Sequence, residues 1–501
     1  MVLGAETHVA RAFQARVGGP ERAALRTRST GSRFLVCLAL TLLFGLAPRT
    51  ATPQTRDVNA READGTTALH WAAREDNADE VRRLLRAGAR ADVTNRYGVT
   101  PLALAAANGS AVIMDLLIAA GADPNATSSQ AEPVLMTAAR SGSVEAVQCL
   151  LGHGADVNAR EPWQGETALM WAAGGNHAAI AKLLIAHGAG LDARSSVPDF
   201  PRRQAGLTVL PRGNWTPLMY AARQGAVDAA RTLAEAGANL DLVDPDGTTA
   251  LVLAIINVHY DTAAVLIEAG ADPNLADETG MAALYAAADM DTLPWMFGRP
   301  DPKLTDRLSG ADIVAMLLEY GADPNARLKS VLMQRHHTGG DFALGEGSTP
   351  LMRAAKSGDL PVMRLLLKHG ADPKIAQKNN TTALMLAAGF GWRDGNAAIP
   401  TRDRGSVKDA IEAIKLCLDG GVDIRAANDA GDTVLHAAAT RGSDVIIQFL
   451  VDKGADVHAK NKQGRTPLDA ALARRGASAV PAAVAIFQKL GGVESSPQSG
   501  Q

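Results

Sequence analysis

Residues that could carry out chemistry are scattered through this 501-residue chain and form no known catalytic motif. His336 and His337, followed by Asp341, offer donor atoms for a metal ion. A metal site needs further ligands at suitable spacing, and none is apparent, so a solvated polar loop is the better interpretation. The sequence also lacks a serine-hydrolase elbow, a phosphate-binding loop, a metalloprotease helix and a paired Cys-x-x-Cys. We therefore predict a protein that is not an enzyme, with no catalytic residue, no cofactor and no metal.

The cysteines and several histidines have structural explanations. Three cysteines do not make a disulfide framework. Cys149 and Cys417 lie in helical stretches far apart, and we expect both to be small buried apolar residues. Three histidines each precede a glycine that ends a helix, where a cation also suits the helix dipole: His153, His187 and His369.

A repeated sequence unit must position any functional residues that the chain has. The stretch from Tyr97 to Asn125 reads YGVTPLALAAANGSAVIMDLLIAAGADPN, and its features recur along most of the sequence. Leucines equivalent to Leu102 stand at positions 69, 102, 135, 169, 218, 251, 284, 351, 384, 435 and 468. Six of the ten intervals between them are 33 residues, and one is 34. A fixed period of this length indicates a stacked array of about eleven units rather than separate globular domains.

Each part of the unit favours a pair of helices. Thr100 can cap a first helix that Pro101 begins, because proline lacks the amide hydrogen that would be left unpaired there. Apolar residues within 112–117 follow at helical spacing and predict a second helix. Gly121 then ends this helix in a left-handed conformation. One such unit cannot bury its apolar face alone, so the units must stack.

These features resemble the ankyrin repeat family, in stretches such as Gly65-Thr66-Thr67-Ala68-Leu69-His70 and Gly464-Arg465-Thr466-Pro467-Leu468. We place the array of repeats at residues 56–490. The resemblance implies an all-α solenoid of stacked helix-turn-helix units with β-hairpin-like finger loops, and a function in binding other proteins. It also implies that His70 and His436 hydrogen-bond the backbone of the fingers.

The composition narrows the range of partners. The chain carries 50 basic and 53 acidic residues, and this near balance gives no reason to expect binding to nucleic acid. Apolar residues make up 47% and aromatic residues 4% of the chain, which fits closely packed helices rich in alanine and leucine. We expect the repeats themselves to be soluble, because no later apolar run reaches membrane length.

Residues 1–55 precede the repeats. Several arginines are followed by a 14-residue apolar run at 34–47, FLVCLALTLLFGLA, whereas about 20 residues are needed to span a bilayer. A basic region, a short apolar segment and a polar stretch predict a secretory signal and an exported protein, periplasmic or secreted. The alternatives are a retained N-terminal membrane anchor and an arginine-rich organelle transit peptide. Residues 491–501 form a polar tail that we expect to be disordered.

Four insertions interrupt the period of 33 residues. Two of them extend fingers, at 195–210 and 328–343, and two separate the helices of one unit, near 289–309 and 389–407. We expect these loops to wall a groove over the fourth to ninth units. The two inter-helix loops contain aromatic and arginine residues, which often anchor interfaces: Trp295, Phe297, Arg299, Phe390, Trp392 and Arg393. The alternative is that the two tryptophans fold back over the helix ends beneath them.

Further contact residues are expected at the finger tips and at the exposed ends of first helices: Arg96, Tyr97, Arg140, Trp163, Trp215, Arg223, Lys356 and Arg441. We therefore predict a non-enzymatic scaffold that binds another protein through its concave face and its inserted loops. A second hypothesis is that the groove binds a small molecule or a cell-envelope glycan. A third is an enzyme with an unrecognised site in the insertions.

Overall fold

The computed structural model describes residues 57–128, 130–197, 213–292, 306–330, 343–391, 406–473 and 481–494. Residues from Asn59 onwards belong to one compact unit. Within the described residues, twenty-two helices form eleven consecutive pairs. None of these helices combines the length and the apolar character that crossing a bilayer requires.

The helices of each pair follow one another closely in the chain. The first helices are α2 (Ala68–Arg74), α4 (Pro101–Asn108), α6 (Val134–Ser141), α8 (Ala168–Gly174), α10 (Pro217–Gln224), α12 (Ala250–Ile256), α14 (Ala283–Asp291), α16 (Pro350–Ser357), α18 (Ala383–Ala388), α20 (Val434–Arg441) and α22 (Pro467–Leu472). The second helices are α3 (Ala78–Arg86), α5 (Ala111–Ala119), α7 (Val144–Gly152), α9 (Ala178–Ala186), α11 (Val227–Glu235), α13 (Tyr260–Glu268), α15 (Gly310–Glu319), α17 (Leu360–Lys368), α19 (Val407–Asp419), α21 (Asp444–Asp452) and α23 (Pro481–Lys489).

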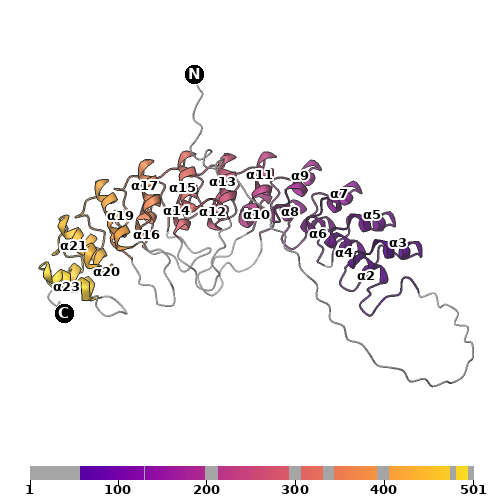
Figure 1. Cartoon of the computed structure of the whole chain (residues 1–501), viewed down its shortest axis with the longest axis horizontal. Coiled ribbons are helices and arrows are strands. Elements are labelled where there is room, and N and C mark those ends of the chain that lie inside the picture. Colours follow the sequence, from indigo (N-terminus) through magenta and orange to yellow (C-terminus); the bar gives the residue numbers. More distant parts are fainter. Residues whose placement is uncertain are drawn as a thin grey trace, which may run out of the picture. The chain divides into compact units, whose positions relative to one another are not determined.

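The first helices form one row and the second helices form another (Figure 1). Each first helix packs against the second helix of its own pair and against the first helices of the neighbouring pairs, as α4 does against α5, α2 and α6. The second helices also contact one another along their own row. This arrangement confirms the all-α solenoid of stacked helix pairs.

The local signals of the repeat act as expected in the second pair. The Thr100 hydroxyl oxygen accepts a hydrogen bond of 3.0 Å from the backbone amide of Ala103, and Pro101 occupies the first turn of α4. Leu117 of α5 is fully buried. Gly121 has a φ of +98°, a left-handed conformation that a side chain with a Cβ atom resists. Capping, burial and the glycine stop therefore define the unit locally, and stacking completes it.

The finger loops between the pairs are β-hairpin-like, as the resemblance implied. Isolated antiparallel bridges close several of them, including the bridge between Ala427 and Thr433. Neighbouring fingers also bond to each other, because the backbone amide of Arg96 donates to the carbonyl oxygen of Asp64 at 2.8 Å. The same type of bond joins later fingers: Glu278 to Asp246, Lys378 to Glu346, Asp429 to Asn379 and Lys462 to Ala430.

Two histidines tie a first helix to the next finger. The backbone amide of Thr67 donates to Nδ1 of His70 at 3.2 Å, and Nε2 lies 3.0 Å from the carbonyl oxygen of Val99. A neutral ring protonated on Nε2 satisfies both contacts, and burial lowers the pKa of His70. In His436, Nε2 likewise lies 3.0 Å from the carbonyl oxygen of Arg465. The role that the resemblance implied for these histidines is confirmed.

Most of the four predicted insertions lie outside the described residues, at 198–212, 293–305, 331–342 and 392–405. Their C-terminal edges next to α15 and α19 are described. Ser309 and Ser406 each cap the following helix and exchange hydrogen bonds with an aspartate three residues on. Because this capping box starts α19 at Val407, the 13-residue helix begins inside the predicted insertion. The helix thus starts at the C-terminal edge of the range predicted for this insertion.

Candidate recognition surface

The row of first helices carries arginine side chains stacked on aromatic rings. The guanidinium carbon of Arg74, at the end of α2, lies 5.3 Å from the ring centre of Trp71. Arg140 of α6 lies 5.0 Å from the ring centre of Trp171 in α8, so this contact joins the third and fourth pairs. Both arginines are exposed. A cation over an aromatic face is attracted by about 0.5–1 kcal/mol at exposed sites, which favours a defined position for each guanidinium.

A third stacked arginine corrects one prediction. Arg223, near the end of α10, lies 5.1 Å from the ring centre of Trp215. Trp215 is only 4% exposed, so its predicted exposure as a contact residue is wrong. Its backbone amide donates to the Ser195 hydroxyl at 2.9 Å, and its ring packs edge-on against Tyr220 with centres 5.6 Å apart. The solvent-facing member of this pair is Arg223.

Acidic side chains at the bases of the fingers hold this surface in place. Glu132 forms an ion pair of 3.4 Å with Arg140 and accepts a hydrogen bond of 2.8 Å from the Thr137 hydroxyl. Glu166 accepts a hydrogen bond of 2.6 Å from the Tyr220 hydroxyl. Burial raises the pKa of Glu166 and also that of Tyr220. These acids therefore serve the packing of the surface, whereas the arginines face the solvent.

Sequence reasoning missed the aromatic residues that the first helices contribute to this surface, although a signal was present. Trp71, Trp171 and Tyr220 each stand two residues after the leucine that marks the repeat. The three stacked arginines each stand five residues after that leucine: Arg74, Arg140 and Arg223. Residues three apart in a helix share one face, so a comparison of the repeat positions would have found this face.

The finger tips add exposed aromatic residues. Trp163 is 82% exposed and Tyr97 is 50% exposed, and the guanidinium of Arg96 lies 4.6 Å from the Tyr97 ring centre. The Glu161 carboxylate accepts hydrogen bonds from the backbone amides of Trp163 and Gln164, at 2.6 and 2.8 Å. This carboxylate organises the turn from which Trp163 projects. The predicted exposure of all three tip residues is confirmed, and their role in binding stays a prediction.

Other predicted contact residues are buried in part or lie outside the described residues. Five predicted contact residues lie outside the described residues: Trp295, Phe297, Arg299, Trp392 and Arg393. The polar residues His336, His337 and Asp341 also lie outside them. Phe390 follows α18 and is half-buried, and its backbone amide donates to the carbonyl oxygen of Met385 at 2.9 Å. Lys356 and Arg441 are also half-buried.

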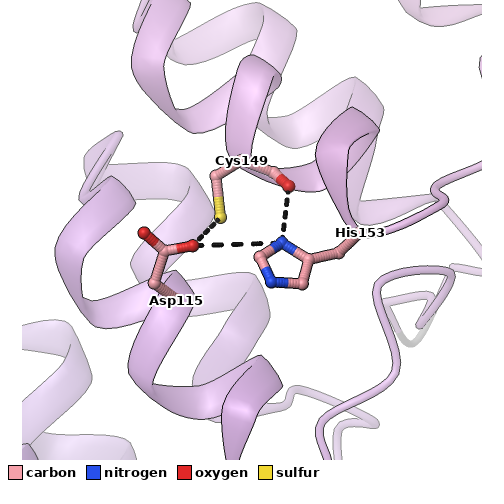
Figure 2. A group of neighbouring side chains, drawn as sticks. All are labelled: Asp115, Cys149 and His153. Carbon is pink, nitrogen blue, oxygen red and sulfur yellow. Dashed lines mark hydrogen bonds and ion pairs between the residues drawn. The ribbon is translucent and has the colours of Figure 1, made fainter.

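One group of metal-ligating atoms lies on the row of second helices (Figure 2). Asp115 in α5, Cys149 in α7 and His153 at the end of α7 bring donor atoms within 4.8 Å of one another. The Cys149 thiol donates to the Asp115 carboxylate at 3.0 Å, and Nδ1 of His153 lies 2.8 Å from the carbonyl oxygen of Cys149. These three donors are of the types that bind zinc.

The contacts of this group favour a structural role. His187 makes the same Nδ1 contact with a carbonyl oxygen, that of Leu183 at 2.9 Å, so the position of His153 belongs to the repeat. Burial, and then the hydrogen bond and charge of Asp115, raise the pKa of Cys149 to about 12, so at neutral pH the thiol keeps the proton that it donates to the Asp115 carboxylate. Cys149 is half-buried and hydrogen-bonded, which corrects the expectation of a buried apolar residue, and Cys417 is buried as expected.

A buried carboxyl group lies where the seventh and eighth pairs meet. Asp359 caps α17: one carboxylate oxygen accepts a hydrogen bond of 3.1 Å from the Val362 amide, and the other is buried. Burial, and then the charge of Asp291 at the end of α14, raise the pKa of Asp359 to about 7. Arg353 of α16, which also bonds Asp289, opposes this rise. The junction therefore holds a carboxyl group that titrates near neutral pH.

The chain forms a repeat solenoid of stacked helix pairs. Hydrogen bonds join its fingers, and its first helices expose one face. The family model for ankyrin repeats (three copies) matches residues 37–128, 113–195, 135–244, 205–277, 312–396 and 406–482. These matches cover most of the chain. The chain belongs to the ankyrin repeat family.

Individual relatives match shorter stretches. The chain is 47% identical over 49 residues to ankyrin repeat family A protein 2 of Mus musculus, which is 10% of this chain and 16% of that protein. It is 33% identical over 126 residues to ankyrin repeat and SOCS box protein 6 of Homo sapiens, which is 25% of this chain and 23% of that protein. The chain thus spans less than a quarter of the length of either relative. The crystal structure of the human ASB11 ankyrin repeat domain matches with a TM-score of 0.40 and 22% identity, covering 52% of this chain and 100% of that domain.

Proposed function

We propose that this protein is a non-enzymatic scaffold that binds another protein through the first-helix row and the fingers of its first five repeats. Ankyrin repeats generally serve as protein–protein interaction modules. One observation carries the proposal: exposed aromatic and arginine side chains gather on this part of the chain. They are Tyr97 and Trp163 on the fingers and Arg74, Arg140 and Arg223 on the helices. Aromatic residues and arginine are the types that most often dominate binding energy.

The contacts around these residues support binding without large rearrangement. Backbone hydrogen bonds join the fingers, and ring contacts hold the arginine side chains. Each flexible side chain that is ordered before binding saves about 0.5–1.5 kcal/mol of ordering cost. The predicted groove of inserted loops would extend the surface towards the ninth repeat, and that part of the hypothesis rests on the sequence.

Affinity purification of the full chain from its native compartment, with chemical crosslinking and mass spectrometry, tests this proposal. The double variant Tyr97→Ala/Trp163→Ala should lose the partner that the wild type captures. Tyr320→Ala is a matched control, because Tyr320 is an exposed aromatic residue (48%) at the end of α15 in the other row of helices. The same partners captured by all three proteins would contradict the proposal.

We also propose that the protein is exported, on the basis of the basic region and the apolar segment at 34–47. Cell fractionation and N-terminal sequencing of the purified protein test this. A mature N-terminus shortly after residue 47 is expected outside the cytoplasm. A full-length chain in the membrane fraction would instead favour the retained anchor.

A further inference from the structure

We infer that the partner presents an extended acidic segment to Arg74, Arg140 and Arg223, which we call the arginine row. This inference rests on the proposed function and names the chemistry of the partner. The three residues occupy one repeat position, five residues after the marker leucine, in the first, third and fifth pairs. The surface is therefore periodic, and a partner that follows the stack meets the same group at every second pair of helices.

The way each arginine is held favours a carboxylate ligand. All three side chains are exposed, and each guanidinium lies over an indole ring at 5.0–5.3 Å. Stacking occupies one face of the planar group and leaves N–H groups at its edge, which match the two oxygens of a carboxylate. An ordered guanidinium also loses less conformational entropy when it binds.

Two acids on the same surface, Glu132 and Glu166, are half-buried. The Glu132 side chain is 17% exposed, compared with 49% for its ion-pair partner Arg140. Glu166 is occupied by the hydrogen bond from the Tyr220 hydroxyl. At the ends of α6 and α10 the charge that an approaching partner meets is therefore mainly that of Arg140 and Arg223, whereas exposed Glu75 and Asp76 follow Arg74 at the end of α2. The charge of the arginines complements an acidic chain.

The spacing of the row indicates how the acidic segment is built. Packed helices lie about 8–10 Å apart, so arginines on every second first helix are separated by about 16–20 Å. An extended chain advances about 3.3 Å per residue, so acidic residues about five or six positions apart reach successive arginines. The equivalent positions of the second and fourth pairs are neutral, Ala107 and Gly174. Such wide gaps suit spaced carboxylates better than nucleic acid, whose phosphates form a continuous charge.

Fluorescence anisotropy with the full chain tests the inference. The probe is a labelled twelve-residue peptide with glutamate at every second position among serine and glycine, and the control peptide has glutamine at the same positions. We expect the acidic peptide to bind about tenfold more tightly, and to bind less tightly at higher salt. The triple variant Arg74→Gln/Arg140→Gln/Arg223→Gln should weaken its binding about tenfold, the combined effect of three exposed ion pairs.

The matched control removes three exposed arginines from the second helices, Arg86→Gln/Arg231→Gln/Arg364→Gln, and so changes the net charge equally. Circular dichroism checks that both triple variants are folded. Equal weakening in the two triple variants would overturn the inference, because it would show a response to net charge alone. Tighter binding of a twelve-nucleotide single-stranded DNA would overturn it in favour of nucleic acid.

Capture of the native partner separates this inference from the proposed function. If the arginine triple variant still captures the partner and Tyr97→Ala/Trp163→Ala does not, the scaffold function stands and the acidic partner is wrong. If both variants capture the same partner as the wild type, both proposals fail. Loss of the partner in both variants, with the second-helix control unaffected, is the result that we expect.

Discussion

Asparagine in place of Asp359 should remove much of the pH dependence of the junction between the seventh and eighth repeats. In the folded protein, burial and the charge of Asp291 raise the pKa of Asp359 to about 7, whereas an aspartate in an unfolded chain titrates near pH 4. Between these values the folded state holds a proton that the unfolded chain has released. The contribution to stability is therefore fully present below about pH 4 and is lost as the pH rises through about 7.

The size of the effect follows from the separation of the two pKa values. Each pH unit of separation is worth about 1.4 kcal/mol, so about three units correspond to about 4 kcal/mol in the free energy of unfolding. Asparagine is also a good residue at a helix N-cap, and its carboxamide oxygen can accept the hydrogen bond from the Val362 amide. Asp359→Asn should therefore match the wild type in acid and be more stable than the wild type above pH 7.

Hydrogen exchange measured by mass spectrometry suits this test, because a long repeat array need not unfold in one step. The protection of peptides from α16 and α17 is compared between pH 5.5 and pH 8.5, after correction for intrinsic exchange rates. Asp291→Asn should also reduce the pH dependence, since it removes the neighbouring charge. If wild type and Asp359→Asn lose protection equally with rising pH, the reasoning about this carboxyl group is refuted.

Three further predictions concern stability and binding. Leu251→Ala, at a fully buried position of α12, should lower the free energy of unfolding by about 2–5 kcal/mol. Leu304→Ala, in an insertion outside the described residues, should lower it much less. Urea unfolding of both variants checks which residues belong to the repeat and which to the insertion. Thr100→Ala removes the cap of α4 and should cost about 1 kcal/mol, measured in the same way. Trp163→Ala should change stability by less than about 0.5 kcal/mol, because the side chain is exposed, and should weaken partner capture. A large loss of stability in Trp163→Ala would mean that this residue is structural.

The sequence predicts the repeat units well because their signals are local. The cap at Thr100, the proline that follows it and the glycine stop at Gly121 lie within one unit, and each defines its own stretch of backbone. Stacking then follows from burial, since one helix pair leaves an apolar face uncovered. The number of pairs and the finger loops could therefore be derived before any coordinates.

The recognition surface could be predicted only in part, because it depends on contacts between units. The exposure of Trp163 at a finger tip follows from its local turn, whereas Trp215 is buried, bonds Ser195 of the preceding finger through its backbone amide and packs its ring on Tyr220. Cys149 likewise forms its hydrogen bond with Asp115, which lies 34 residues earlier on the neighbouring helix. The repeat position fixes where a side chain leaves the backbone, and contacts with a neighbouring unit determine whether it reaches solvent.

The same two repeat positions form different contacts in different units of the stack. Arg140 and Trp171 occupy the positions five and two residues after the marker leucines of adjacent units, and form an exposed cation–π contact. Asp289 and Arg353 occupy the equivalent positions in the seventh and eighth units, and form an ion pair whose side chains are 25% and 9% exposed. This ion pair therefore has little surface to offer a partner. Between pH 6 and pH 8, the affinity for the partner should therefore change less than the hydrogen-exchange protection of α16 and α17. A larger change in affinity than in protection would place recognition in the later repeats.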